Sequence, residues 1–361
     1  MPKYALRYLP LLGLLLLLIP WHLYMASWTN QSTAAAWSPY NPGPALYGVT
    51  MLSTNDVWAV GGSFEQEEDQ QRVRIIYAVS GIILHYTDGA WAAVDTLQKP
   101  LFSVSLDSPR DGWAVGYGGI LVHYDGKTWS TVTGPANFNN NLLGVAMTSP
   151  ENGWAVGYGG SILHYDGQQW TAYPGPTTAD LRAIAMPSPH EGWAVGDSGT
   201  ILHYHAGTWS LVKSAPATSN TLRSISMLSA DEGWMVGDNG TILHYRGEDG
   251  VWEGVYRAPG LQSVRLVGVA MTTVRAGWIV GEQQFLTYRS EVWTGPESVS
   301  CPIGGKTAVP GTYLSLYGIA MAGSGEGWAV GALDTSPTSF SLNTYSILHY
   351  THGQWCPAPS F

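Results

Sequence analysis

A single motif occurs seven times along this chain, and this repetition constrains the fold more than any other feature. Its clearest copies are GWAVGYGGILVHYDGKTW from Gly112, GWAVGYGGSILHYDGQQW from Gly153 and GWAVGDSGTILHYHAGTW from Gly192. The first tryptophans of successive copies lie 39 to 55 residues apart, a period typical of β-propellers. These first tryptophans are Trp58, Trp113, Trp154, Trp193, Trp234, Trp278 and Trp328. The second tryptophans are Trp91, Trp129, Trp170, Trp209, Trp252, Trp293 and Trp355.

Each copy predicts four short strands, A to D, as at residues 142–148, 153–157, 161–165 and 169–173. β-Branched and aromatic residues fill these runs, and Gly, Asn or Asp stands at each joint, which favours antiparallel sheet. One such sheet cannot cover both of its apolar faces, whereas seven sheets set radially cover one another. We therefore expect an all-β fold, a seven-bladed β-propeller of four-stranded antiparallel blades, with no strand exchanged between the first and last blades. The expected blades are 45–98, 99–136, 137–178, 179–217, 218–260, 261–311 and 312–361.

Residues 1–36 are interpreted as an export segment, followed by a lead-in at 37–44. Lys3 and Arg7 precede an apolar run at residues 9–28, and this charge order favours translocation of the chain that follows. The run is long enough for an uncleaved transmembrane anchor, whereas the three alanines before Trp37 fit a cleaved signal peptide, and both alternatives stay open. The propeller is expected outside the cytoplasm, membrane-anchored or secreted.

Charge and cysteine content exclude several classes of partner. The chain has 16 Lys and Arg against 26 Asp and Glu, for a net charge of -10. Because phosphate contacts need concentrated positive charge, nucleic acid and anionic lipid are not expected partners. The two cysteines, Cys301 and Cys356, are not spaced as a zinc site, but they could form a disulfide in an oxidising compartment. No cofactor is predicted.

The repeat core of GWAVG, ILHY, DG and W resembles the photosystem II stability and assembly factor type of repeat, a relative of the BNR or Asp-box repeats of sialidases. The resemblance covers residues 45–358. The Asp-box pattern is degenerate: YDGKTW at residues 124–129 comes closest, and His123 replaces its serine. The resemblance implies a propeller and, in photosynthetic relatives, a role in escorting reaction-centre proteins. Similar repeats also occur in exported bacterial proteins without such a partner.

The histidines of strand C occupy one slot in six of the seven copies. Metal ligands must converge to about 2 Å from one ion, whereas equivalent positions on neighbouring blades lie about 10 Å or more apart, so no metal site is predicted. We expect these histidines and the paired tryptophans to pack between blades. Acids before the first tryptophan are expected in A–B turns. The histidines are His85, His123, His164, His203, His244 and His349, with Thr287 in the seventh copy; the acids include Asp111, Glu191, Glu232 and Glu326.

Four charged residues stand where strands A and B meet at one end of their blades. Arg182 and Arg223 lie near the start of strand A, and Asp197 and Asp238 follow strand B. They predict either two cross-strand salt bridges beside the central channel or a binding site for an anion or partner at the channel mouth. A sialidase would bring three arginines together, and the third is missing from the corresponding positions, so enzyme activity is not expected. Those positions hold Tyr47, Phe102, Leu143, Val267 and Tyr317.

Three insertions mark the preferred partner-binding region. Residues 61–80 and 331–346 lengthen the B–C connections of blades 1 and 7, and residues 300–311 lengthen the connection between blades 6 and 7. All three are expected as loops on one face of the ring, where a rigid scaffold commonly carries function. The first is interpreted as a solvated charged loop, with a calcium site as the less favoured alternative. Its charged residues are Glu65, Glu67, Glu68, Asp69, Arg72 and Arg74.

These features together predict an exported, non-enzymatic propeller that binds a protein partner or an envelope component. The alternative is a carbohydrate-binding or sensing propeller, which would use exposed aromatics such as Tyr47 and Tyr317 at the channel mouth. A sialidase-like glycoside hydrolase is the least favoured alternative.

Overall fold

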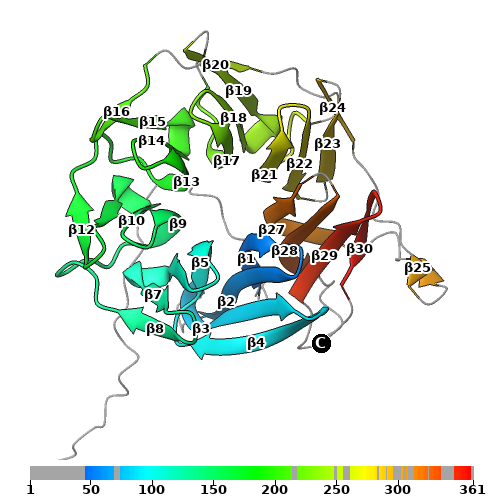
Figure 1. Ribbon diagram of the computed structural model, residues 1–361, viewed down its shortest axis with the longest axis horizontal. Helices are drawn as coiled ribbons and strands as arrows, with labels where there is room; N and C mark the ends of the chain where they lie inside the picture. The colour runs from blue at the N-terminus through cyan, green and yellow to red at the C-terminus, as the bar shows by residue number, and fades with distance from the viewer. Residues whose placement is uncertain are drawn as a thin grey trace, which may run out of the picture. The chain divides into compact units, whose positions relative to one another are not determined.

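The computed structural model describes residues 45–68, 74–213, 218–247, 250–254, 261–282, 284–289, 291–295, 302–303, 306–307, 313–323, 325–334 and 345–358. These residues form seven four-stranded antiparallel sheets arranged around a central axis (Figure 1). The predicted seven-bladed β-propeller is therefore confirmed. The predicted export segment and lead-in lie outside the described residues, and within the described residues no helix has the length and apolar character needed to cross a bilayer.

Each blade consists of four consecutive strands, so no strand is exchanged between the first and last blades, as expected. Blade 1 contains β1 (Ala45–Ser53), β2 (Asp56–Glu68), β3 (Arg74–Thr87) and β4 (Ala90–Leu97). Blade 2 contains β5 (Leu101–Ser108), β6 (Asp111–Gly116), β7 (Leu121–Tyr124) and β8 (Trp129–Val132), and blade 3 contains β9 (Leu142–Ser149), β10 (Asn152–Gly157), β11 (Ile162–Tyr165) and β12 (Trp170–Tyr173). Blade 4 contains β13 (Leu181–Ser188), β14 (Glu191–Gly196), β15 (Ile201–His205) and β16 (Thr208–Leu211).

The last three blades repeat the same order. Blade 5 contains β17 (Leu222–Ser229), β18 (Glu232–Gly237), β19 (Ile242–Arg246) and β20 (Val251–Gly254). Blade 6 contains β21 (Leu266–Thr273), β22 (Ala276–Gly281), β23 (Gln284–Arg289) and β24 (Val292–Thr294), and blade 7 contains β27 (Tyr313–Ala322), β28 (Glu326–Asp334), β29 (Tyr345–Thr351) and β30 (Gln354–Pro357). A small hairpin of β25 (Pro302–Ile303) and β26 (Lys306–Thr307) lies between blades 6 and 7 in sequence.

Tryptophan pairs hold neighbouring blades together. At six of the seven blade boundaries, the first tryptophan of one blade meets the second tryptophan of the next blade edge to face, as in Trp58 with Trp129 at a ring-centroid distance of 5.5 Å. The same contact closes the ring, because Trp328 of blade 7 meets Trp91 of blade 1 at 5.1 Å. Aromatic side chains bury large apolar areas and prefer this geometry. The tryptophans are therefore inter-blade packing residues, as the sequence predicted.

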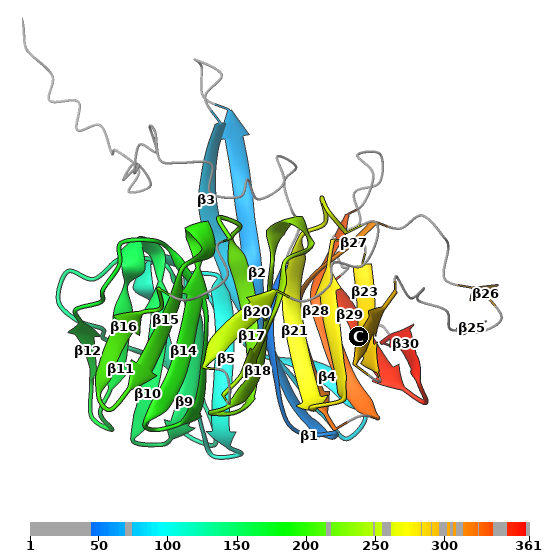
Figure 2. The same ribbon diagram turned by 90° about the horizontal axis from the view of Figure 1, so that it is seen from above.

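The insertion in blade 1 is a β-hairpin, so its prediction as a loop was wrong, while Glu65 is exposed to solvent as expected. The pairing of β2 with β3 continues beyond the blade from Ser63 opposite Ser80 to Glu68 opposite Arg74. Figure 2 shows both strands rising above the rest of the ring. Ile75, Ile76 and the residues around them carry strand-forming side chains, which favour continued pairing over a loop. Glu65, Glu67, Glu68 and Arg74 are thus strand residues, while Asp69 and Arg72 lie outside the described residues.

Candidate functional site at the channel mouth

Every strand A contains a β-bulge near its first residues. In blade 4, Leu181 pairs with Gly196 and Ala183 with Val195, which leaves Arg182 as the extra residue. Strand B ends in glycine here because a Cβ on Gly196 would lie 2.0 Å from the carbonyl oxygen of Asp180. A bulge locally interrupts the ladder and bends the strand, which re-aims the side chain of the extra residue. The bulge residues are Tyr47, Phe102, Leu143, Arg182, Arg223, Val267 and Tyr317.

These seven residues form a ring at the channel mouth. The A strands, β1, β5, β9, β13, β17, β21 and β27, lie nearest the centre of the propeller (Figure 1). The bulges stand at the end of the blades where the B–C connections emerge, which we call the B–C face; the opposite end, with the A–B turns, is the A–B face. The ring divides into an apolar arc and a charged arc.

The apolar arc lies on blades 7, 1, 2 and 3, and Leu143 of blade 3 packs against its aromatic cluster. The Tyr47 ring lies 5.5 Å from the Phe102 ring and 5.5 Å from the Tyr317 ring, measured between centroids. Phe64, at the base of the extended hairpin, stacks on Phe102 at 6.2 Å and meets Tyr117 edge to face at 5.8 Å. The hairpin of blade 1 is therefore packed into the same aromatic cluster as the bulge residues.

The expectation that Tyr47 is an exposed aromatic was wrong. Its side chain is 8% exposed and belongs to the core of the cluster, whereas Tyr317 is half-buried. Burial raises the pKa of the Tyr47 phenol, and the neighbouring Tyr317 adds to this effect. Tyr47 therefore supports the channel mouth from within rather than presenting a ring face to a ligand.

The charged arc begins on blades 4 and 5, where the predicted salt bridges are present. Arg182 donates from Nε and Nη2 to the two carboxylate oxygens of Asp197 at 2.7 and 2.8 Å. Arg223 donates in the same way to Asp238 at 2.5 and 2.8 Å. Asp197 and Asp238 each open a 3-10 turn, η3 (Asp197–Gly199) and η4 (Asp238–Gly240), that follows strand B. Two-point contacts of this kind fix the guanidinium plane as well as its position.

The charged arc continues onto blade 6 through Arg265. The bulge positions did not predict this residue, because the bulge residue of blade 6 is Val267. The Nε of Arg265 lies 3.6 Å from Asp238, and its Nη1 lies 2.8 Å from Glu282. A third arginine is thus present, two residues before the bulge, but it faces carboxylates of the chain itself. Because all three arginines are paired with acids, the arc does not present the uncompensated triad that a sialidase would need.

Charges within this arc influence one another across the blade boundary. Burial alone would raise the pKa of Asp197, but hydrogen bonds from Arg182 and Thr221 and the charge of Arg223 hold the pKa below its usual value. On the other side, the Arg182 guanidinium lies 5.8 Å from the centre of the Tyr158 ring of blade 3. The charged arc therefore runs from blade 4 to blade 6 and meets the Tyr158 ring of blade 3 at its edge.

A second repeated constellation lies toward the A–B face. The acid that begins strand B contacts the strand C histidine, as in Asp111 with His123 at 2.8 Å, and that histidine packs on the first tryptophan, Trp113, at 4.6 Å. The acids predicted only as turn residues are thus histidine partners. Equivalent contacts are Asp56 with His85, Asn152 with His164, Glu191 with His203, Glu232 with His244 and Glu326 with His349.

Blade 6 lacks both members of this pair, with Ala276 and Thr287 in the two positions. The sequence carried a usable signal for the contact: in blades 2 to 5 the two residues are separated by 12 positions, and both are lost together in blade 6. Blade 4 adds a second histidine, because His205 also contacts Glu191.

Cys356 in β30 is disulfide-bonded. Its predicted partner, Cys301, is the other cysteine of the sequence and lies outside the described residues.

Comparison with known proteins supports the resemblance inferred from the repeat. The family model described as photosynthesis system II assembly factor YCF48 matches residues 165–263. A solved structure described as YCF48 bound to D1 peptide has a TM-score of 0.60 and 17% identity, covering 86% of this chain and 92% of that one. YCF48 from Cyanidioschyzon merolae gives 0.59 and 17%, covering 87% and 97%. The resemblance to YCF48 is therefore confirmed.

More distant propellers also match. The WD40 propeller domain of Doa1 has a TM-score of 0.58 and 12% identity, covering 82% of this chain and 92% of that one. No curated protein matches this chain in sequence. At these identities, the structural matches establish the fold.

Proposed function

We propose that this chain is an exported, non-enzymatic scaffold that binds a peptide segment of a protein partner at the channel mouth. The observation that carries the proposal is the division of one ring of bulge residues into an aromatic arc and a charged arc. A peptide that lies across the mouth would place apolar side chains near Tyr317 and Phe64 and charged groups near Arg182 and Arg223. Peptide sites commonly combine apolar anchors with a few charge-assisted contacts.

The hairpin of blade 1 gives a second reason to place the partner on the B–C face. Beyond Gly62, the extension of β2 pairs with β3 alone among the described strands. Two-stranded ribbons are marginal by themselves, and their edges can accept an added strand. A bound segment that pairs with the hairpin would also contact the aromatic cluster at its base, which contains Phe64.

The comparisons support a peptide as the ligand. YCF48, a propeller of similar fold, is described in complex with a D1 peptide. That complex belongs to another protein at 17% identity, so the partner of this chain is proposed by its chemistry, as a protein segment that carries both apolar and charged side chains. The paired state of Arg182, Arg223 and Arg265 favours a scaffold over a hydrolase.

The export segment gives the proposed location. Lys3 and Arg7 before an apolar run favour an extracytoplasmic propeller, so the partner would be an envelope or membrane protein with a segment on that side. The carbohydrate alternative is weakened, because Tyr47 is buried and cannot offer its ring face to a sugar.

Photo-crosslinking tests the proposed site directly. A photo-reactive phenylalanine analogue is placed at Tyr317 in the full-length chain, and a matched chain carries it at Arg110, an exposed position in an A–B turn. In native envelope, we expect position 317 to crosslink to a peptide of an envelope protein, identified by mass spectrometry, and position 110 not to do so. Crosslinks to glycan alone, or equal crosslinking at both positions, would refute the proposal.

Shortening the hairpin tests its contribution. Glu65 and Tyr77 are opposite each other in the ladder, so residues 66–76 can be replaced by Asn-Gly, which closes a two-residue turn. This variant retains Phe64 and the aromatic cluster. We expect at least a roughly tenfold loss of the crosslinked product, because an added strand contributes main-chain hydrogen bonds. Undiminished crosslinking would assign partner binding to the channel mouth alone.

A further inference from the structure

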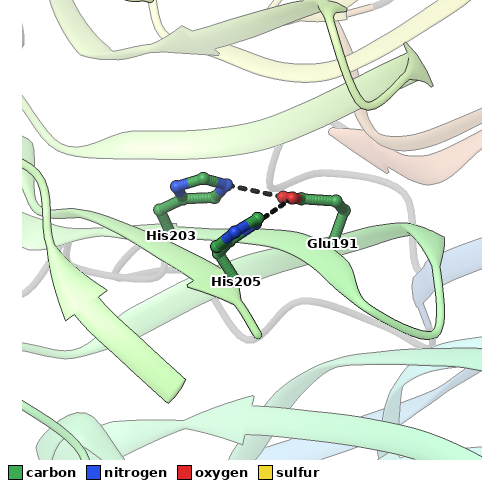
Figure 3. Close-up of side chains that lie close together, drawn as sticks. All are labelled: Glu191, His203 and His205. Atoms are coloured by element: carbon green, nitrogen blue, oxygen red, sulfur yellow. Dashed lines mark hydrogen bonds and ion pairs between the residues drawn. The ribbon is translucent and has the colours of Figure 1, made fainter. Parts of the chain in front are cut away.

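Three metal-ligating side chains meet on blade 4, at the A–B face and away from the channel mouth. Glu191 begins β14 and is the register partner of His205 in β15, while His203 lies two residues earlier on the same strand. Successive side chains of a strand alternate between faces, so His203 and His205 share one face. Both imidazoles point toward the Glu191 carboxylate, and the three ligand atoms lie within 4.8 Å of one another (Figure 3).

The second histidine distinguishes blade 4 from the other blades. Contact between the first residue of strand B and the strand C histidine is part of the repeat, but His205 takes a position where no other blade has histidine. The residues at that position in the other blades are Thr87, Asp125, Asp166, Arg246, Arg289 and Thr351. The packing of the repeat does not require His205, whose side chain is 68% exposed.

Two of the three groups are held in place by their surroundings. The His203 ring stacks on Trp193 at 4.0 Å with an interplanar angle of 12°, and its Nε2 lies 2.7 Å from Glu191 Oε2. The backbone N–H of Glu191 donates to Ser188 Oγ at 3.1 Å.

We propose that Glu191, His203 and His205 form a binding site for a divalent transition metal ion such as Zn²⁺. Imidazole nitrogen and carboxylate oxygen are common ligands of these ions, at about 2.0–2.2 Å from zinc. A metal ion would replace the hydrogen bonds between the carboxylate and the two rings, and the exposed His205 leaves room for a short adjustment. Water would complete the coordination, because three protein ligands leave one position of a tetrahedral site open.

The repeat pattern of one histidine per blade does not reveal this site. Equivalent positions on different blades are too far apart to share an ion. The three ligands proposed here come instead from two adjacent strands of one blade, where the register between β14 and β15 brings them together.

Calorimetric titration of the untagged full-length chain with ZnCl₂ tests the site. We expect one saturable binding event per chain and at least a roughly tenfold weaker affinity in His205→Ala, since loss of one of three ligands weakens a metal site strongly. His205 is exposed, so this variant retains the fold. His352→Gln removes another exposed histidine, in blade 7, and is expected to leave the affinity unchanged.

A second variant builds the same constellation in blade 5. Glu232 and His244 are already in contact at 2.5 Å, and Arg246 is the register partner of Glu232. Arg246→His should therefore raise the Zn²⁺ stoichiometry from one to two per chain. The proposal is overturned if the wild type shows no saturable binding, if binding survives His205→Ala, if it falls equally in His352→Gln, or if Arg246→His still binds one equivalent.

Discussion

The two arcs of the channel mouth meet between blades 3 and 4, which present different side chains on the same local backbone. In blade 3, the bulge residue and the first residue after strand B are Leu143 and Tyr158; in blade 4, they are Arg182 and Asp197. Both pairs stand beside the same bulge and the same 3-10 turn. These two blades thus share one scaffold at the mouth, and two positions in each blade set its chemistry.

Removing the centre of the apolar arc should have the largest effect. Tyr47→Ala deletes a buried ring that contacts Phe64, Phe102 and Tyr317 and leaves a cavity. We expect the free energy of unfolding to fall by about 3–4 kcal/mol, as for other buried aromatic truncations. Urea denaturation followed by tryptophan fluorescence measures the change.

The matched control is Tyr47→Phe, which retains the ring and removes only the hydroxyl. Its cost should be about 1 kcal/mol or less, because a single hydrogen bond contributes little net stability. Equal losses in both variants would show that the hydroxyl, rather than aromatic packing, holds the apolar arc together.

Converting the charged arc into the apolar one should have an intermediate effect. Arg182→Leu leaves the partly buried Asp197 without its main partner, and we expect a loss of about 2 kcal/mol, below the cost of breaking a fully buried pair. Adding Asp197→Tyr reproduces the Leu143–Tyr158 pair of blade 3 and should restore at least about 1 kcal/mol, because no unpaired carboxylate then remains. A double-mutant cycle by urea denaturation measures the coupling; additive losses would contradict the interchangeability of the two arcs.

The smallest expected effect is on the stability of the fold at low pH. The pKa of Asp197 is lower in the folded chain than its ordinary value of about 3.9, so its ion pair stabilises the fold fully above that value. This contribution is lost as the pH falls through the folded pKa. Wild type should therefore lose more stability than Arg182→Leu/Asp197→Tyr when urea unfolding is compared at pH 5 and at pH 3. Identical acid losses in the two proteins would show that the pair does not titrate as described.

Much of the fold could be predicted because the repeat encodes it locally. The GWAVG run with its closing glycine marks strand B, and the second tryptophan marks strand D, so each blade is specified within about 40 residues. The hairpin of blade 1 differs from the predicted loop because the strand-forming Ile75 and Ile76 continue the ladder opposite the charged Glu67 and the polar Gln66. The contact between Asp111 and His123 was not predicted, because it forms only when strands B and C pair and bring together residues 12 positions apart.

The sequence by itself determined the number of blades, the strand order and the positions that line the channel, because each depends on a pattern repeated seven times. The tertiary structure decided what those positions do. It buried Tyr47 within a cluster of rings from three blades, paired Arg182 with Asp197, and brought Arg265 to Asp238 from a neighbouring blade. It also joined Glu191 to two histidines through strand register. These outcomes depend on distances between residues in different strands and blades, and those distances are set by closure of the ring and by pairing of the strands.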